Sequence, residues 1–466
     1  MQHNRENLNR AAKILIDLQL AQSVDAAYAM LGRYAFTIVV GKDAVRTESG
    51  QVCLLTMANA GARACAGGVR IVGVDGDERL VTGLGSGQTL GQAIQRLGGQ
   101  IAGEAFSNAP LVLLGDCTSQ GADVPAIRVT YGGWSGGVLP AEDGFRLPED
   151  SMFPLAAVLA GALAVSECFA YLLGRDRWAG RRSLGLSLAM PGTDWRHGEG
   201  LEPYYLPSGL WLLGLGHLGQ AYAWTLAALP YPDSKALVCL QDDDHVTLST
   251  PSTSVLTYHR HIGHLKTRVV SRWLEARGFA TRLVERRFDG RLLLADADPR
   301  ILLAGVDNLS TRRLLESPGF ALSIDAGLGS TAADYDEFFV QTFTNRGKAA
   351  VAFPDARRTL TSEEKVDRNR AAYEALGLDR CGIVLAADAA AGVPFVGLTV
   401  SCLVIAEAIR AIAGGNLIDT TVGSLRSIVG IDSFSHGTKI SNPGFIIPRS
   451  PLGGPPRPGP QRRCQR

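Results

Sequence analysis

Three glycines stand at the spacing Gly-x-Gly-x-x-Gly within the stretch LWLLGLGHLGQAYA, namely Gly214, Gly216 and Gly219. The apolar run before them predicts a strand, and the residues after them favour a helix. Such a turn lets backbone amides approach phosphate, and the amino end of the helix adds positive potential. The stretch therefore predicts a phosphate-binding loop, which could serve a dinucleotide or ATP, or could be a structural turn that binds no phosphate.

Acidic and basic residues follow this loop at informative places. Asp242 lies 23 residues after Gly219, at the end of the next predicted strand, where an acid commonly binds ribose hydroxyls. A second acid follows at Asp244, whereas a dinucleotide needs only one. Lys266 begins the next predicted helix, where its ammonium can neutralise a triphosphate, although a lysine on a helix is often simply solvated. These residues favour a nucleoside triphosphate over a dinucleotide.

A third apolar strand, ILLAGVD, ends in Asp307 and Asn308, and Arg312 follows. An acid at the carboxyl end of a strand, over the same sheet edge, can hold magnesium. The pair is equally suited to capping the helix that follows. Taken together with the loop, these residues predict a site for a magnesium nucleoside triphosphate.

The motifs G-x-G-x-x-G, D-x-D-x-V, I-G-x-x-K and V-D-N-x-x-x-R, in this order, resemble the ubiquitin-activating superfamily, which includes the ThiF and MoeB proteins. The resemblance covers about residues 208–415. It implies an enzyme that uses ATP and magnesium to adenylate the C-terminal carboxylate of a ubiquitin-like (β-grasp) protein. It also implies a role for each matching residue: phosphate binding by Gly214, Gly216 and Gly219, ribose binding by Asp242 and Asp244, phosphate neutralisation by Lys266, and magnesium binding by Asp307 beside Asn308.

One segment departs from the family. Where the family has S-N-L-x-R-Q, this chain has STPSTSV from Ser249 to Val255, and Thr253 stands in place of the arginine. Arg5 or Arg10, in the predicted N-terminal helix, is a candidate to replace the missing charge. The departure leaves open a nucleotide-binding scaffold without activity.

A cysteine is the second candidate for chemistry. In the family a reactive cysteine lies on a crossover loop before the proline that opens a long helix, and Cys381 lies 13 residues before Pro394. The predicted crossover loop spans about residues 353–393. The neighbouring Arg380 favours a thiolate, which can capture the acyl adenylate as a thioester for a conjugating enzyme. The alternative is that Cys381 is one more small buried residue.

Composition narrows the class of protein. The 466 residues carry 46 Lys and Arg against 45 Asp and Glu, a net charge of +1, which favours neither nucleic acid nor a membrane surface as partner. None of the eight cysteines forms a C-x-x-C pair, so we expect no zinc site. The pattern favours reduced thiols and a cytoplasmic location, and the polar N-terminal stretch does not predict a secretory signal.

Two apolar runs, 154–174 and 394–414, resemble each other. In each, a Glu follows the opening Pro by 13 positions and a Gly follows it by 20. The charges favour buried core helices over membrane spans, and the matching markers indicate a duplication. We expect an α/β protein with two Rossmann-like repeats of mainly parallel sheets flanked by helices. The predicted boundaries are 1–190 for a degenerate, inactive repeat, 191–440 for the active repeat, and 441–466 for a disordered tail.

The coarse secondary structure supports this division. The predicted strands of the first half are FTIVVG, VCLLTMA, VRIVGV, LVLLGD and AIRVTYGGW, and its glycine-rich stretch is 83–99. Strands and helices alternate in the second half, which predicts a parallel sheet. Residues 1–35 show helical patterns and could support a homodimer.

The sequence thus leaves several functions open. The resemblance implies an activating enzyme of a bacterial conjugation system, and some such systems serve antiphage defence. A sulfur-carrier adenylyltransferase of cofactor synthesis uses the same chemistry. An NAD(P)-dependent oxidoreductase needs only the glycine loop and Asp242, and leaves Lys266, Asp307 and Cys381 without a role.

Overall fold

The structure is a computed structural model of the 466-residue chain. The residues that it describes are 8–84, 89–119, 124–149, 153–197, 200–201, 204–232, 236–329, 331–344, 349, 374, 390–435, 437–440 and 443–449. Cys381, Arg5 and nearly all of the predicted crossover loop lie outside these ranges.

The first sheet has seven strands, of which the five at one end are parallel, and each of the last two runs antiparallel to the strand before it. In spatial order they are β3 (Gly99–Ile101), β2 (Gly68–Val72), β1 (Ala35–Val40), β4 (Leu111–Leu114), β5 (Ala126–Gly132), β6 (Ser135–Pro140) and β7 (Leu184–Ser187).

The second sheet repeats this order with eight strands, of which the first five are parallel, and each of the last three runs antiparallel to the strand before it. They are β11 (Ala280–Val284), β10 (Leu237–Gln241), β9 (Gly209–Leu213), β12 (Ile301–Ala304), β13 (Leu322–Leu328), β14 (Glu337–Thr344), β15 (Thr420–Ser424) and β16 (Asp432–Phe434). The shared topology confirms the predicted fold class of two Rossmann-like repeats.

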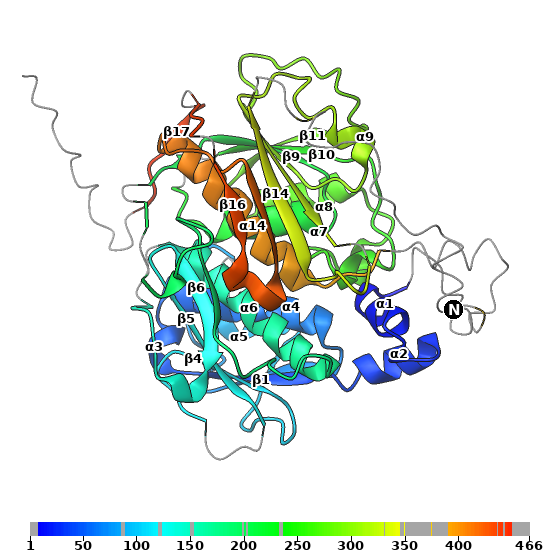
Figure 1. Cartoon of the computed structure of the whole chain (residues 1–466), viewed down its shortest axis with the longest axis vertical. Helices are drawn as coiled ribbons and strands as arrows, with labels where there is room; N and C mark the ends of the chain where they lie inside the picture. Colours follow the sequence, from blue (N-terminus) through cyan, green and yellow to red (C-terminus); the bar gives the residue numbers. More distant parts are fainter. Residues whose placement is uncertain are drawn as a thin grey trace, which may run out of the picture.

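A layer of helices separates the two sheets (Figure 1). Helices α4 (Glu48–Ala64) and α6 (Pro154–Leu173) belong to the first repeat, and α7 (His217–Ala228) and α14 (Pro394–Ile412) to the second. Helix α6 packs on both α4 and α14, and α14 packs on α7, so the two repeats meet helix against helix. One continuous apolar core contains side chains of both repeats.

The two long apolar helices are core helices, as predicted. Both are long and apolar enough to span a membrane, yet 89% of the apolar window of α6 and 100% of that of α14 is buried inside the protein. The Glu that each carries is hydrogen-bonded to the segment that follows its helix. Glu167 accepts from Gly180 N at 2.8 Å, and Glu407 accepts from Ile418 N at 2.7 Å.

The remaining elements are short. The helices are α1 (Arg10–Asp17), α2 (Val24–Leu31), α3 (Lys42–Val45), α5 (Leu90–Arg96), α8 (Lys266–Glu275) and α9 (Leu309–Arg312). Five 3-10 turns are described, η1 (Ala141–Asp143), η2 (Trp195–His197), η3 (Thr250–Ser252), η4 (His259–His261) and η5 (Leu425–Gly430). A small sheet pairs β17 (Phe445–Ile446) with β8 (Leu206–Pro207).

Two predictions about these elements were wrong. The run VCLLTMA is not a strand but the middle of α4, which Thr47 caps by accepting a hydrogen bond from Gly50 N at 3.1 Å. An element buried on every side shows no periodicity in its sequence, so a continuous apolar run does not distinguish a strand from a helix. The predicted disordered tail also begins too early, because β17 pairs with β8 inside it.

Candidate functional site

The glycine loop lies at the carboxyl ends of β9, β10 and β12. Strand β9 pairs with β10 on one side and with β12 on the other, so the order in which strands are added to the sheet reverses at β9. In open α/β sheets this reversal point is where ligands bind. The predicted phosphate loop therefore lies at the position that the fold itself favours.

The three glycines have different tasks in the loop between β9 and α7. Gly214 has φ +81°, and a Cβ there would lie 2.8 Å from Gly305 O. A Cβ on Gly219 would lie 2.0 Å from Gly214 O, so neither position admits a side chain without movement. A Cβ on Gly216 meets nothing within 4 Å, and no side chain caps α7 there. The first amides of α7 thus have no side-chain cap, as a helix end that binds phosphate requires.

Asp242 fastens this loop to the neighbouring strand. Its carboxylate accepts from Leu215 N at 2.6 Å and from Asp244 N at 2.8 Å. Burial raises the pKa of Asp242, and Lys266 and the two amides oppose this effect. The structure thus gives Asp242 a structural task in the loop, and its predicted contact with ribose stays a prediction.

Lys266 lies beside the same acids. It is the first residue of α8, as predicted, and its Nζ lies 2.7 Å from Asp244 Oδ2. The backbone joins the two residues as well, because Lys266 N donates to Asp244 O at 3.0 Å. The ion pair holds the ammonium at the end of β10, next to the strand that carries the glycine loop.

Asp307 and Asn308 follow β12, whose end contacts the loop through the bond from Gly305 N to Leu213 O at 2.9 Å. Asn308 caps α9 by accepting from Thr311 N at 2.8 Å, which is the capping role that the sequence also allowed. Asp307 is exposed. The acids close enough to share one metal ion, among the residues described, are Asp242, Asp243 and Asp244, and Asp307 is not in that group.

The N-terminal helix approaches the site from the side. Arg10 N donates to Ser252 Oγ at 3.3 Å, within the segment that departs from the family pattern. Its guanidinium donates to Ala390 O at 2.8 Å. Together with burial, the charge of Arg10 lowers the pKa of His217 to about 4. Of the two arginines that the sequence offered, Arg10 therefore lies beside the first turn of α7.

His217 was missed by the sequence analysis. It is the first residue of α7, and its imidazole packs on α14, where a Cβ on Gly397 would lie 2.5 Å from His217 Cδ2. Its Nε2 is buried without a hydrogen-bond partner among the residues described. No local sequence pattern predicts that His217 packs on α14, because this contact joins residues that are far apart in the chain.

A buried acid beside the site was also missed. Asp325 on β13 is fully buried, and its Oδ2 lies 3.4 Å from Arg312 Nε in an ion pair without hydrogen-bond geometry. Burial raises the pKa of Asp325 to about 7, although Arg312 opposes the rise. Arg312 also donates to Val306 O at 2.7 Å, so the arginine of the V-D-N-x-x-x-R motif braces the turn that carries Asp307.

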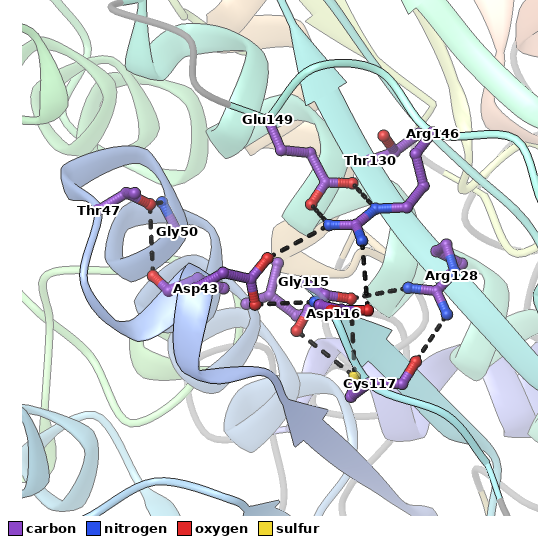
Figure 2. A network of polar contacts seen from close by, with 12 residues as sticks. Asp43, Thr47, Gly50, Gly115, Asp116, Cys117, Arg128, Thr130, Arg146 and Glu149 are labelled. Carbon is purple, nitrogen blue, oxygen red and sulfur yellow. Dashed lines mark hydrogen bonds and ion pairs between the residues drawn. The ribbon is translucent and has the colours of Figure 1, made fainter.

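The equivalent edge of the first repeat is filled by its own side chains (Figure 2). Arg146 Nη2 lies 2.6 Å from Glu149 Oε2 and 3.4 Å from Asp43 Oδ2. Asp43 Oδ1 accepts from Asp116 N at 2.8 Å, which ties the turn after β1 to the turn after β4. The described parts of the glycine-rich stretch 83–99 lie elsewhere, at 83–84 and from 89 through α5 to the start of β3.

Six cysteines fall within the described residues, and five of them are buried: Cys53, Cys65, Cys168, Cys239 and Cys402. Burial raises the pKa of each of these five thiols. Cys117 is partly exposed, and its pKa is also raised by burial. None of the described cysteines is thus favoured as a thiolate. Cys381 lies outside the described residues.

Comparisons with known proteins identify relatives. The models of a BilD N-terminal domain and a BilD C-terminal domain match residues 35–188 and 206–415. A bacterial E1-like protein BilD from Collimonas sp. (strain OK412) is 37% identical over 431 residues, which are 91% of this chain and 93% of that protein.

Solved structures show a weaker likeness. A crystal structure of E. coli MccB with selenomethionine MccA has a TM-score of 0.33 at 15% identity, covering 49% of this chain and 63% of that one. E. coli MccB with ATP has a TM-score of 0.32 at 16% identity, with coverages of 51% and 66%. This chain thus spans less than two thirds of those chains. The assignment to a family depends on the two domain models and on the Collimonas relative.

Proposed function

Because this chain belongs to the BilD family of bacterial E1-like proteins, we propose that it is an ATP-dependent activating enzyme. In this proposal it adenylates the C-terminal carboxylate of a ubiquitin-like protein and then holds the acyl group as a thioester. The family assignment supports an activating enzyme in general, and the arrangement of the second repeat supports adenylation in particular.

One observation carries the proposal most directly. The uncapped amino end of α7 lies at the reversal point of the second sheet, and Lys266 is held beside it by Asp244. Amides and an ammonium at one sheet edge suit the phosphates of ATP better than a dinucleotide, whose pyrophosphate needs no lysine.

The chemistry needs little covalent participation by the protein in its first step. The partner's carboxylate oxygen attacks the α-phosphorus of ATP, an acyl–phosphate bond forms, and the bond to pyrophosphate breaks. The loop amides and Lys266 stabilise the charge that grows on the phosphate oxygens. Arg10 is our candidate for the arginine that the segment Ser249–Val255 lacks, because it contacts that segment at Ser252.

Magnesium fits the acidic side chains at this edge. Carboxylate oxygens are its preferred ligands, and both Asp307 and the group from Asp242 to Asp244 offer them. When bound, the ion would neutralise charge on the triphosphate. We keep Asp307 as the proposed ligand, since it follows the strand that contacts the glycine loop.

The second step is assigned to Cys381. Its thiolate attacks the acyl carbon, a thioester forms, and AMP leaves. A conjugating enzyme would then receive the acyl group. This assignment depends on the resemblance alone, because Cys381 lies outside the described residues.

The first repeat is proposed to be inactive. Its equivalent sheet edge is occupied by Asp43, which accepts from Asp116 N and pairs with Arg146 at the place where the active repeat would take a phosphate (Figure 2). The setting that we propose is a bacterial conjugation system in the cytoplasm, with a role in antiphage defence as one form of it.

ATP–pyrophosphate exchange with purified candidate ubiquitin-like proteins tests the function. The proposal expects exchange that depends on both magnesium and the partner, and a reducible conjugate that Cys381→Ala abolishes while exchange continues. Cys117→Ser is the matched control, because that cysteine belongs to the first repeat. Absence of exchange, together with thermal stabilisation by NADH but not by ATP, would refute the proposal.

A further inference from the structure

Helix α4 of the first repeat grips a segment of the second repeat with two side chains. Arg63 Nη1 donates to Pro251 O at 2.6 Å and to Thr257 O at 2.8 Å. Arg63 Nη2 and Asn59 Nδ2 both donate to Val255 O, at 2.9 Å and 3.0 Å. Four hydrogen bonds thus join one turn of α4 to the backbone of residues 251–257.

The environment of Arg63 is unusual for a cation. The guanidinium is half-buried, and desolvation lowers the pKa of Arg63. Its Nε donates to Asn59 Oδ1 at 2.9 Å, and its Cζ lies 5.1 Å from the ring centroid of Tyr258. Among the residues described, no carboxylate forms an ion pair with it. Because the charge is balanced by carbonyl dipoles, its contacts act to fix the backbone that supplies them.

The gripped segment is bonded in turn to the glycine loop. Leu256 N and Thr257 Oγ1 donate to Gln220 Oε1, at 2.9 Å and 2.8 Å. Gln220 is fully buried on α7, and its Nε2 donates to Leu215 O at 3.1 Å. Leu215 is the residue between the first two glycines, and its amide is held by Asp242. Hydrogen bonds, linked by the backbone of residues 255–257, therefore connect Arg63 to the loop.

We propose that Arg63 and Asn59 are positioning residues of the nucleotide site, acting through Gln220 on the backbone of the glycine loop. This inference rests on the proposed function. A loop whose backbone is already fixed binds phosphate without the entropic cost of ordering its amides. The affinity for ATP should therefore depend on the hydrogen bonds from Arg63 and Asn59. The first repeat then serves the second by holding its phosphate loop in shape.

The test measures ATP binding by the full-length protein with isothermal titration calorimetry. Arg63→Ala is expected to weaken binding about threefold to thirtyfold, the range usual for residues that act through a connected network. In pyrophosphate exchange the KM for ATP rises while kcat changes little. Arg63→Lys keeps a cation and is expected to recover part of the affinity.

Arg277 supplies the matched control. It is a partly buried arginine just after α8 that also bonds across the repeats, to Leu84 O, and its hydrogen bonds do not lead to the loop. Arg277→Ala is expected to leave ATP affinity within about twofold. Asn59→Ala removes the bond to Val255 O and the bond that Asn59 Oδ1 accepts from Arg63, and it serves if Arg63→Ala fails to fold, with an expected loss of about twofold to fivefold.

The outcomes separate the two proposals. If unmodified protein binds no ATP, the proposed function fails. If it binds ATP, and Arg63→Ala and Asn59→Ala bind equally well, only the positioning role fails. Equal weakening by Arg63→Ala and Arg277→Ala would also overturn the positioning role, because it would reflect a general loosening between the repeats.

Discussion

Single side chains in this site divide between holding the loop and facing the ligand. The carboxylate of Asp242 accepts hydrogen bonds from the amides of Leu215 and Asp244, while the ammonium of Lys266 forms an ion pair with Asp244. An ion pair of this kind is easily exchanged, because Asp244 is largely exposed and solvent replaces it at low cost. We therefore expect Lys266 to exchange Asp244 for a phosphate when a nucleotide binds.

Lys266→Ala is expected to lower kcat/KM for pyrophosphate exchange about a hundredfold, the usual effect of removing one preorganised charge from a transition state. Arg268→Ala is the control, since Arg268 lies on the same helix and pairs with Glu285. Steady-state exchange assays compare the two. Equal losses in both variants would contradict a specific role for Lys266.

Asp325 predicts a pH dependence of stability. Its pKa in the folded protein is raised to about 7, so the native state binds a proton more tightly than the unfolded state does. Between about pH 4 and pH 7 the free energy of unfolding should therefore fall with rising pH, by up to about 1.4 kcal/mol per unit. Asp325→Asn should flatten this slope and stabilise the protein at pH 8.

Urea unfolding at pH 5 and pH 8 measures the effect. The exposed residue Asp296 gives a control variant, Asp296→Asn, which is expected to keep the slope of the unmodified protein. A slope that Asp325→Asn leaves unchanged would mean that Asp325 is not the group responsible.

At the scale of elements, the turn between β9 and α7 separates structure from function within one motif. Gly219 is needed so that α7 can approach the turn, whereas Gly216 borders open space. The two glycines look alike in the sequence, and only the fold assigns them different tasks.

A pair of variants tests this division. Gly219→Ala should lower the free energy of unfolding by about 1–3 kcal/mol, because its Cβ would collide with Gly214 O. Gly216→Ala should leave the melting temperature close to that of the unmodified protein and weaken ATP binding instead. Thermal unfolding and calorimetric titration give the two readouts, and the reverse pattern would refute the assignment.

At the scale of the whole molecule, the repeats share a core. Side chains such as Trp224 of α7 and Thr56 of α4 bond directly, from Nε1 to Oγ1 at 3.1 Å, and α6 packs on α14. Neither repeat can therefore expose its helix layer without loss of apolar burial.

We expect the chain to unfold in one transition, although chains of this size often show several. Tryptophans report on both halves, with Trp134 in the first repeat and Trp211 in the second. Fluorescence and far-ultraviolet circular dichroism should give coincident melting curves. Two separated transitions would show that the repeats are independent units.

The sequence predicted features that depend on neighbouring residues and missed contacts between residues far apart in the chain. The glycine loop, Lys266 at a helix start, and the two core helices are each visible within a short stretch of chain. The grip of Arg63 on the backbone near Val255 joins residues 192 positions apart, and no local pattern reveals it. The helix α4 was taken for a strand because burial on all sides removes the periodicity that separates the two.

The packing of α6 on α14 also matters while the protein is being made. After Leu173 is added, 220 residues must follow before Pro394 opens the helix that covers α6. At common rates of bacterial translation this takes roughly 10 to 40 seconds. During that interval the face of α6 that later packs on α14 is not yet covered by α14 in the nascent chain. The yield of active protein in a cell should therefore depend on chaperone supply and on the speed of translation.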